Sequence, residues 1–413
     1  IVKKEEDIMK KFNKVLSVVV ASAMVMAMAG CGNTDNGSAA TGTNAATESA
    51  AADNGAASGS VFKIGGIGPT TGGAAVYGLA VQHGAEIAVE EINAAGGING
   101  YQVEFKFQDD EADAEKSVNA YNALKDWGAQ IIDGSTTSGA CIAVTDKTKE
   151  DNMFQITPSG SAVECVQYDN NFRVCFSNPN QGLASAQYIG ENGLAEKIAV
   201  IYDSSDVYSS GIYEKFVKEA ENQPFEVVAA EAFTADNKTD FSVQLQKAKD
   251  AGADMVFLPI YYQESALILT QAAAMGYAPK WFSCDGMDGI LGGVDNFDVS
   301  LTEGVMLLTP FAADATDDLT QSFVTKYKEK YGETPNQFAA DSYDAIYVIK
   351  AAIEKSGVTP DMSVSDICDG MKAAMTEITV DGLTGNGMTW TADGEANKAP
   401  KAVVIENGAY KAM

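Results

Sequence analysis

The chain has 413 residues, of which 46% are hydrophobic and 21% are charged, a composition typical of a globular protein with two or three domains. Its formal net charge is −29, and Arg173 and His83 are its only arginine and its only histidine. Without a basic surface, the chain is not expected to bind nucleic acid. A single histidine also excludes most histidine-rich metal sites and disfavours histidine-based catalysis. We therefore expect no metal, no cofactor, and a packing or surface role for His83.

The first thirty residues have the pattern of an export signal. Lysines at positions 10, 11 and 14 precede an apolar run from Val15 to Ala29, which at about fifteen residues is too short to span a membrane comfortably. The run ends in MAGCG, which resembles the bacterial lipobox, with Met28 standing where leucine is usual. We expect residues 1–30 to be a lipoprotein signal peptide and Cys31 to carry a lipid that anchors the protein to the outer face of the cell membrane. The alternative is an ordinary secretion signal in which Cys31 is incidental.

A polar, small-residue segment follows the predicted lipidation site. Residues 31–60 are rich in Gly, Ser, Ala, Thr and Asn and lack large apolar side chains. This composition predicts a flexible tether, which as a random coil would reach roughly 30 Å. Such a tether would let a folded domain stand clear of the membrane surface.

Five cysteines lie beyond the tether, at positions 141, 165, 175, 284 and 368. None has the CxxC spacing of a zinc or thioredoxin-type site. In an exported chain, Cys165 and Cys175 could pair across a short loop. The alternative is that these cysteines are buried free thiols, which pack as small hydrophobic groups.

From Val61 the chain alternates between strand and helix patterns. The first run predicts strands at 61–67, 101–109, 129–133 and 153–157, and helices at Tyr77–Ala95, Asp113–Trp127 and Cys141–Glu150. The rhythm restarts after Gln181, with strands at 197–203, 225–233 and 253–260, and helices at Tyr213–Asn222, Phe241–Ala251 and Glu264–Met275, the last of which leads to KWFSCDG. Repeated βα units imply parallel sheets covered by helices on both faces. The sequence therefore predicts an α/β fold of two doubly wound lobes.

Polar loops follow the predicted strands. They read GPTTGGAAVYG, GSTTSGA, PSGS, DSSDVYSSG, IYYQE and CDGMDG. In open parallel sheets, ligands bind beyond the carboxyl ends of the strands. The loops are rich in hydroxyls, Gly, Tyr and Asp and poor in Lys and Arg, which suits a small zwitterion or a neutral polar molecule. Within PSGS, residues Ser159, Gly160 and Ser161 could bind such a ligand or merely cap a helix, which is the commoner use.

The motifs of common enzymes are missing from these loops. GGIGPTTGG has Thr71 where the third glycine of a dinucleotide motif belongs, and no phosphate-binding GK[S/T] follows. There is no GxSxG motif and no second histidine to complete a catalytic triad. We interpret Asp109–Asp110 as a solvated loop rather than an acid/base pair, and we expect that the protein is not an enzyme.

With these residues in view, the chain from about Val61 to its end resembles the type I periplasmic binding proteins of ABC importers, in particular the leucine/isoleucine/valine-binding proteins. The resemblance depends mainly on GPTTGGAAVYGLAVQHGAEIAVEEINAAGGINGYQVEF, and also on GYAPKWFSCDG and TPNQFAADSYDAIYVIKAAI. It implies two lobes that close over an amino acid held in the cleft between them.

The resemblance also assigns roles to particular residues. Ser159, Gly160 and Ser161 fall where such proteins hold the α-amino and α-carboxylate groups of the ligand. Thr137 and Ser138 match the preceding strand end, where a hydroxyl and a backbone N–H meet the carboxylate.

The remaining implied roles are aromatic and acidic. Tyr77 matches an aromatic wall for the ligand side chain, and Tyr208 and Tyr261 match tyrosines that close over the ligand. Asp285 matches the acidic residue that pairs with the ligand ammonium, where branched-chain members commonly have glutamate.

The resemblance further implies a hinge of three segments. The crossings would lie near Asn178–Gly182, Thr309–Phe311 and a last strand around Trp390–Asn397. Lobe 1 would then comprise residues 61–178 and 310–392, and lobe 2 residues 179–309 and 393–413.

The functional hypothesis is a lipid-anchored receptor that captures a small amino acid, with branched-chain amino acids first, and delivers it to an ABC permease. One alternative is a module that senses the ligand for a signalling partner. Another is a receptor for a small amide, a urea-like solute or an aromatic acid, because the same fold hosts these ligands. An enzyme acting on small amides or sugars is the least favoured reading.

Overall fold

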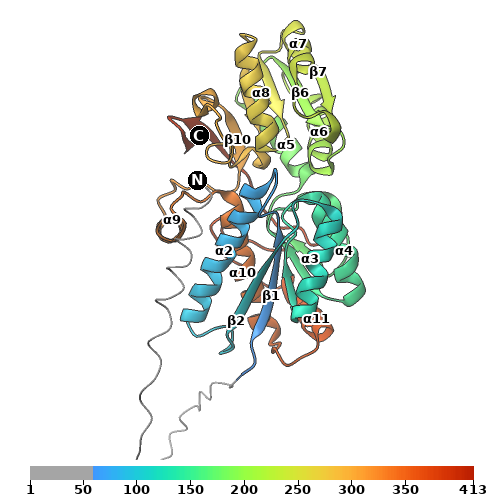
Figure 1. Ribbon diagram of the computed structural model, residues 1–413, viewed down its shortest axis with the longest axis vertical. Coiled ribbons are helices and arrows are strands. Elements are labelled where there is room, and N and C mark those ends of the chain that lie inside the picture. Colours follow the sequence, from blue (N-terminus) through green and yellow to red (C-terminus); the bar gives the residue numbers. More distant parts are fainter. Residues whose placement is uncertain (1–58) are drawn as a thin grey trace, which may run out of the picture. The chain divides into compact units, whose positions relative to one another are not determined.

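The computed structural model describes residues 59–413 (Figure 1). The predicted signal peptide, the lipidation site Cys31 and nearly all of the predicted tether lie outside the described residues. No helix within residues 59–413 is both long enough and apolar enough to cross a membrane.

The first lobe is built on a parallel sheet with the strand order β2-β1-β3-β4-β5. Its strands are β1 (Phe62–Gly68), β2 (Val103–Asp109), β3 (Ile131–Asp133), β4 (Phe154–Thr157) and β5 (Asn171–Arg173). The central strands β3 and β4 are buried along their whole length, as expected for a sheet that is covered on both faces.

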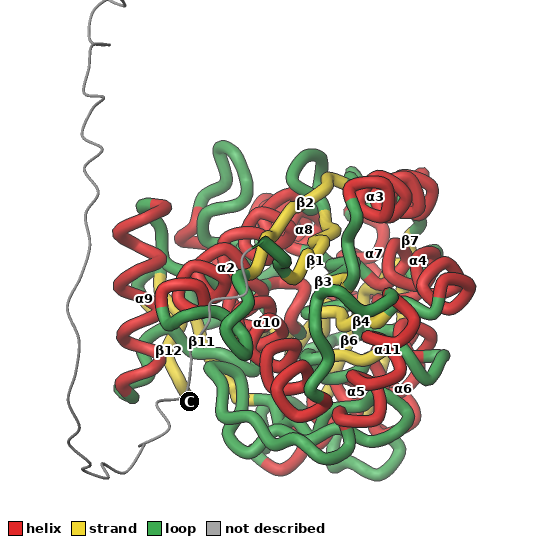
Figure 2. Tube along the Cα trace, turned by 90° about the horizontal axis from the view of Figure 1, so that it is seen from below, coloured by secondary structure: helices red, strands yellow, loops and turns green. Residues whose placement is uncertain are grey.

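Helices cover both faces of this sheet. The helices of the lobe are α2 (Ala75–Ala94), α3 (Ala114–Trp127), α4 (Ser138–Asp151), α9 (Asp318–Tyr331), α10 (Gln337–Ser356) and α11 (Val364–Met375), with the 3₁₀ helix η1 (Val163–Val166) after β4. Figure 2 shows α2 and α10 on one side of the strands and α3 and α4 on the other. Gly84 lets α2 approach α10 closely, because a Cβ there would lie 2.0 Å from the carbonyl oxygen of Ala339.

The second lobe is built on a seven-stranded sheet with the order β12-β11-β10-β9-β8-β6-β7. Its strands are β6 (Lys197–Asp203), β7 (Glu226–Phe233), β8 (Met255–Leu258), β9 (Lys280–Ser283), β10 (Met306–Thr309), β11 (Lys401–Glu406) and β12 (Ala409–Ala412). Strands β6 to β10 pair in parallel, whereas β11 and β12 add an antiparallel edge. The helices are α5 (Asn178–Glu191), α6 (Val207–Ala220), α7 (Ser242–Asp250) and α8 (Tyr262–Ala274), with short 3₁₀ helices η2 (Ala235–Asn237), η3 (Asp285–Met287) and η4 (Val299–Thr302).

Three segments join the lobes. The first lies between β5 and α5, and the second between β10 and α9. The third segment begins after Glu395 and leads into β11. We place its start there because Arg173, in β5 of lobe 1, still contacts Gly394 and Glu395. This third segment is anchored to lobe 1 by Lys398, whose buried Nζ lies 2.8 Å from Oδ1 of Asp341.

The predicted α/β architecture of two doubly wound lobes is confirmed, and the predicted strands and helices mostly agree with the structure to within a few residues. Helix α6 is an exception, because it begins at Val207 rather than at Tyr213. The start of the helix contains Ser209, Ser210 and Gly211, and for that reason the sequence predicted a loop there. The Asp206 side chain nevertheless caps the first turn by accepting a hydrogen bond from the Tyr208 amide.

Two further expectations are wrong. The segment 390–397 is not a strand, since only an isolated bridge joins Trp390 and Ala396. Asp110 is not solvated: it is fully buried, its Oδ1 accepts the amide of Ala112, and burial raises its pKa to about 6. His83 does pack, as expected, with its ring stacked on Tyr331 at 3.7 Å between centroids.

Candidate functional site

A small cavity lies where the two lobes meet, and seven of the nine residues predicted to bind ligand line it. They are Tyr77, Thr137, Ser138 and Ser159 from lobe 1, and Tyr208, Tyr261 and Asp285 from lobe 2. Sequence reasoning missed three more lining residues, Thr136, Gly286 and Phe338. The cavity measures about 10 Å³, which is room for about one water molecule. Gly160 and Ser161 do not line the cavity, although both are buried.

The lobe 1 wall is formed where β3 leads into α4. Thr137 is the N-cap residue of α4, yet its side chain makes no capping bond. Its Oγ1 is buried and has no hydrogen-bond partner within residues 59–413. A hydroxyl without a partner at a helix N-terminus, where amide N–H groups are also free, is suited to bind an anionic group. The wall can therefore supply donors to a carboxylate.

The Ser159–Gly160–Ser161 segment does not cap an α-helix, because only the short helix η1 follows it. Instead, the Ser159 hydroxyl donates to the carbonyl of Thr136 at 2.6 Å, and the Ser161 amide donates to Oγ of Ser138 at 3.2 Å. Glycine is required at position 160, since a Cβ there would lie 2.7 Å from Oγ1 of Thr157. The Ser161 hydroxyl is buried and has no partner in the described chain.

Arg173 positions this segment. It is fully buried, and its guanidinium donates to the carbonyls of Gly160 at 3.2 Å and Ala162 at 2.8 Å. Its Nε lies 3.4 Å from Oε2 of Glu395, just before the third crossing between the lobes. The sequence offered one signal for this role, which is that the single arginine lies close after the serine segment.

Asp285 follows β9 and faces the cavity from lobe 2. The Tyr208 hydroxyl donates to Oδ1 of Asp285 at 2.6 Å, and the side-chain amide of Gln181 donates to its Oδ2 at 2.8 Å. Its side chain has no ion-pair partner in the part of the chain that the structure describes. Burial raises the pKa of Asp285 to about 7, and the two hydrogen bonds only partly oppose this shift. The groups nearby include a second buried acid, Asp341, which raises the pKa further.

Aromatic rings surround the remaining space. The Tyr77 ring lies 4.3 Å from that of Phe338 and 5.5 Å from that of Tyr261, and Tyr208 stacks on Tyr261 at 5.0 Å between centroids. The Tyr77 hydroxyl donates to the carbonyl of Gly286 and accepts the amide of Tyr262, at 3.2 Å for the latter. Because Tyr77 belongs to lobe 1 and both partners to lobe 2, these bonds hold the lobes together across the cavity.

The five cysteines do not form disulfides. All are free and buried in the described structure, so the possible Cys165–Cys175 pair is absent. Cys165 instead interacts with Cys141 beneath the α4 N-terminus, and its Sγ lies 3.7 Å from the carbonyl of Ser138. The thiols therefore pack as small apolar groups next to the lobe 1 wall.

The family and the relatives that comparison with known proteins finds agree with one another. The chain matches the sequence profile of a family described as periplasmic binding protein over residues 61–409. It is 31% identical over 300 residues to Leu/Ile/Val-binding protein homolog 3 of Brucella melitensis biotype 1, covering 72% of this chain and 80% of that protein. It is 30% identical over 303 residues to the leucine-, isoleucine-, valine-, threonine- and alanine-binding protein of Pseudomonas aeruginosa, covering 72% and 79%.

Solved structures agree with these relatives. The branched-chain amino acid transporter substrate-binding protein LivJ of Streptococcus pneumoniae, in complex with isoleucine, has a TM-score of 0.76 and 28% identity, covering 86% of this chain and 99% of LivJ. A solute-binding protein of R. palustris in complex with benzoate has a TM-score of 0.75 but only 20% identity, covering 86% and 95%, and shows the fold alone.

The profile match spans most of the chain, and the relatives and the two-lobed fold agree with it. The chain therefore belongs to the type I periplasmic binding proteins of the leucine/isoleucine/valine-binding family, which are extracytoplasmic solute-binding components of ABC transporters and not enzymes.

Proposed function

We propose that this protein captures a small amino acid and delivers it to an ABC permease. Branched-chain amino acids are the first candidates for the ligand. The observation that carries the proposal is Asp285, a buried carboxylate that faces the cavity and has no cationic partner within residues 59–413. A buried charge without a counterion is costly, so the site favours a ligand that brings an ammonium group. The opposite wall supports the same ligand, because the Thr137 hydroxyl lines the cavity, has no partner within residues 59–413 and is free to donate to a carboxylate.

The charges of the site favour a zwitterion over a simple anion. An aromatic acid such as the benzoate in the R. palustris structure would bring a carboxylate and no cation. The only arginine of the chain, Arg173, is already engaged by backbone carbonyls and Glu395. A benzoate-like ligand would leave Asp285 uncompensated, so we favour the amino acid.

The aromatic walls support an apolar side chain on the ligand. Tyr77, Tyr261 and Phe338 present ring surfaces around the cavity, and burial of aliphatic carbon stabilises binding by roughly 0.8 kcal/mol per CH₂ group. The P. aeruginosa relative is named for leucine, isoleucine, valine, threonine and alanine, and the LivJ structure contains isoleucine. These names are what makes branched-chain amino acids the first choice.

Binding requires the lobes to separate. A cavity of about 10 Å³ cannot hold an amino acid, so the hydrogen bonds from Tyr77 to Gly286 and Tyr262 must break before a ligand enters. Hinged lobes that reclose around the ligand would then bury it. We also propose that Cys31 carries a lipid anchor, and that the partner of the closed form is a permease rather than a signalling protein.

The test of the proposed function is calorimetric titration of the purified chain with each of the twenty amino acids. We expect at least one aliphatic amino acid to bind, and Asp285→Asn to weaken it by about tenfold to a hundredfold. A hydrogen bond to a charged group contributes roughly 1.5–3 kcal/mol, and about 1.4 kcal/mol corresponds to one decade in Kd. The matched control is Asp236→Asn, which removes the same charge from an exposed position in η2. Binding of none of the twenty would contradict the proposal.

The thermal stability of Asp285→Asn separates a ligand role from a structural one. Removing an uncompensated buried charge should leave Tm unchanged or raised at pH 8. A variant with lowered Tm and unchanged affinity would show that Asp285 only supports the turn at η3.

The pH dependence of affinity provides a second test. Because the pKa of Asp285 is about 7 in the free protein, the carboxylate is mostly protonated at pH 5 and must lose its proton to pair with an ammonium. We expect calorimetric titrations between pH 5 and pH 7 to show that the affinity for the amino acid falls by roughly tenfold for each pH unit below about 7. Asp285→Asn should flatten most of this slope. An affinity that is constant from pH 5 to pH 7 in the unaltered protein would rule out ionised Asp285 as the ammonium partner.

The lipid anchor is tested in a bacterial host by Cys31→Ala. The variant should be released into the medium or remain unprocessed, and it should not incorporate labelled fatty acid. Cys368→Ala, which alters a buried thiol in α11, is the control and should stay membrane-bound. A Cys31→Ala protein that is still processed, labelled and membrane-bound would disprove lipidation at this residue.

A further inference from the structure

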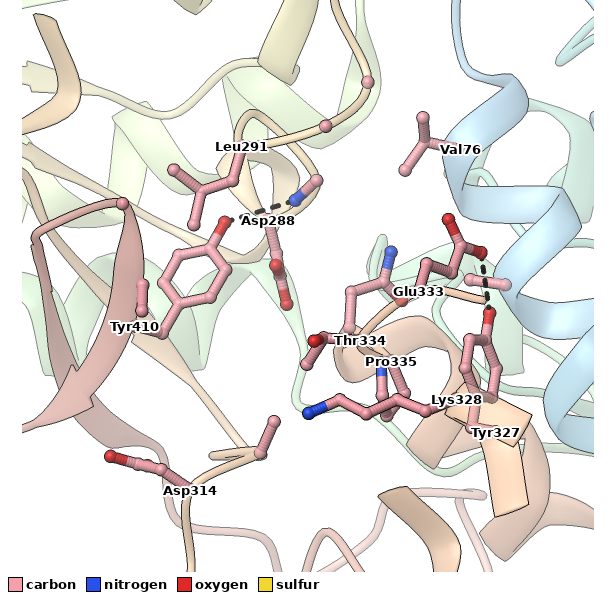
Figure 3. Close-up of a pocket in the computed structure, with 18 of the residues that line it drawn as sticks. Val76, Asp288, Leu291, Asp314, Tyr327, Lys328, Glu333, Thr334, Pro335 and Tyr410 are labelled. Carbon is pink, nitrogen blue, oxygen red and sulfur yellow. Dashed lines mark hydrogen bonds between the residues drawn. The ribbon is translucent and has the colours of Figure 1, made fainter. Parts of the chain in front are cut away.

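A second and much larger pocket lies beside the amino-acid cavity. Its volume is about 460 Å³, within the range of small-molecule sites. Figure 3 shows its walls, which come from six segments. They are the start of α2, the loop after η3, the loop after β10, the last turns of α9, the segment that precedes α10, and the tip of the β11–β12 hairpin. Both lobes therefore contribute to the pocket. None of its lining residues belongs to the amino-acid cavity.

The inner wall of the pocket contains a buried acid. Asp288 is only 4% exposed, and its Oδ2 accepts the backbone amide of Gln337 at 2.9 Å. Its other oxygen, Oδ1, has no hydrogen-bond partner in residues 59–413. Figure 3 shows the carboxylate beside Tyr410, whose hydroxyl accepts the amide of Gly289 at 3.3 Å. Burial raises the pKa of Asp288 to about 6, although the amide of Gln337 and the hydroxyl of Tyr410 oppose this shift.

The outer walls are largely apolar. Leu79 is 38% exposed although it lines the pocket, and Val76 and Leu291 are partly exposed beside it. Two lysines also line the pocket: Lys411 lies 3.9 Å from Asp314, and Lys328 is exposed. The pocket thus combines an uncompensated carboxylate at its inner wall with aliphatic surface nearer its mouth.

We propose that this pocket is a second binding site, which takes a small organic cation consisting of a primary ammonium group on a compact apolar body. The ammonium would supply a countercharge for Asp288 and a hydrogen bond to its Oδ1, which has no partner within residues 59–413. The apolar body would cover Leu79, Val76 and Leu291, which the chain leaves partly exposed. An anionic ligand is disfavoured, because it would bring a second negative charge towards Asp288.

The second site is connected to the amino-acid cavity through Gln337. The backbone amide of Gln337 donates to Asp288, while its side-chain amide donates to the carbonyl of Asp285 at 3.0 Å. Val76 also directly precedes Tyr77 in α2. An occupant that contacts both lobes would therefore alter their separation and so change amino-acid affinity, and the reverse effect must be equal. This coupling rests on the proposed amino-acid binding, whereas the second site itself does not.

The test uses cyclohexylammonium as the probe and its isostere cyclohexanecarboxylate as the charge control, both titrated calorimetrically into the full chain. We expect cyclohexylammonium to bind with and without a saturating branched-chain amino acid, and the carboxylate to bind at least tenfold more weakly. Asp288→Asn should weaken the amine at least tenfold. Asp295→Asn, an exposed residue of the same loop outside the pocket, should change it less than twofold.

A second variant covers the case in which Asp288→Asn does not fold. Leu79→Trp fills the pocket from its exposed wall and should also weaken the amine at least tenfold, with an unchanged circular dichroism spectrum. The proposal is overturned if the amine does not bind, if a saturating amino acid displaces it completely, or if the carboxylate binds as well. If the amine binds while none of the twenty amino acids does, the second site stands and the proposed function fails.

Discussion

The buried carboxylate of Asp285 is the group on which the proposed binding reaction depends. Tyr208 from α6 and Gln181 from α5 hold it in place, so its position is fixed by two helices of lobe 2. Both partners are neutral, and no cation among residues 59–413 pairs with the charge. With a folded-state pKa of about 7 against an ordinary value of 3.8, this group destabilises the folded protein progressively as the pH rises from about 4 to about 7. A bound ammonium would remove that cost. The pair between Asp285 and the ammonium would therefore contribute both to ligand affinity and to lobe closure.

The wall opposite Asp285 can donate hydrogen bonds to a carboxylate, and the residues that hold this wall also contact the segments that join the lobes. Arg173 holds the carbonyls of the serine segment on one side and contacts Glu395, before the third crossing, on the other. The carbonyl of Ser161 accepts the amide of Asn178, the first residue of α5 and the end of the first crossing. The segment that would donate to a carboxylate is thus bonded to two of the three connections between the lobes. A rotation of the lobes would therefore be transmitted to this segment directly.

Much of this fold could be predicted from local patterns, because alternating and helical periodicities directly report which faces of each element are buried. Residues after the strands were also predictable as a group, since parallel strands bring their carboxyl ends together. The antiparallel edge formed by β11 and β12 was missed, because Lys401–Glu406 and Ala409–Ala412 are short, partly exposed strands with weak apolar patterns. The early start of α6 was missed because the Asp206 cap and the hydrogen bond from Tyr208 to Asp285 outweigh the low helix propensity of its first turn.

The supporting residues of the site could not be found from local sequence. Gln181 reaches Asp285 across 104 positions, and Gln337 joins Asp285 and Asp288 from a helix that follows the second crossing. Such contacts leave no periodic signal in the chain, and they depend on how the two lobes pack. The same is true of the pocket at Asp288, whose walls come from six separate segments.

The measurement that tests the central claim most directly is the pKa of Asp285 itself, followed by NMR of its side-chain carboxyl carbon in protein labelled with ¹³C at aspartate and assigned with Asp285→Asn. In the free protein we predict a titration near pH 7, and with a saturating amino acid a fall by at least about one unit, since an opposite charge within hydrogen-bond distance lowers a carboxyl pKa by about 1–3 units. A pKa that is the same in the free and ligand-saturated protein would contradict the claim that Asp285 supplies the countercharge for the bound ammonium.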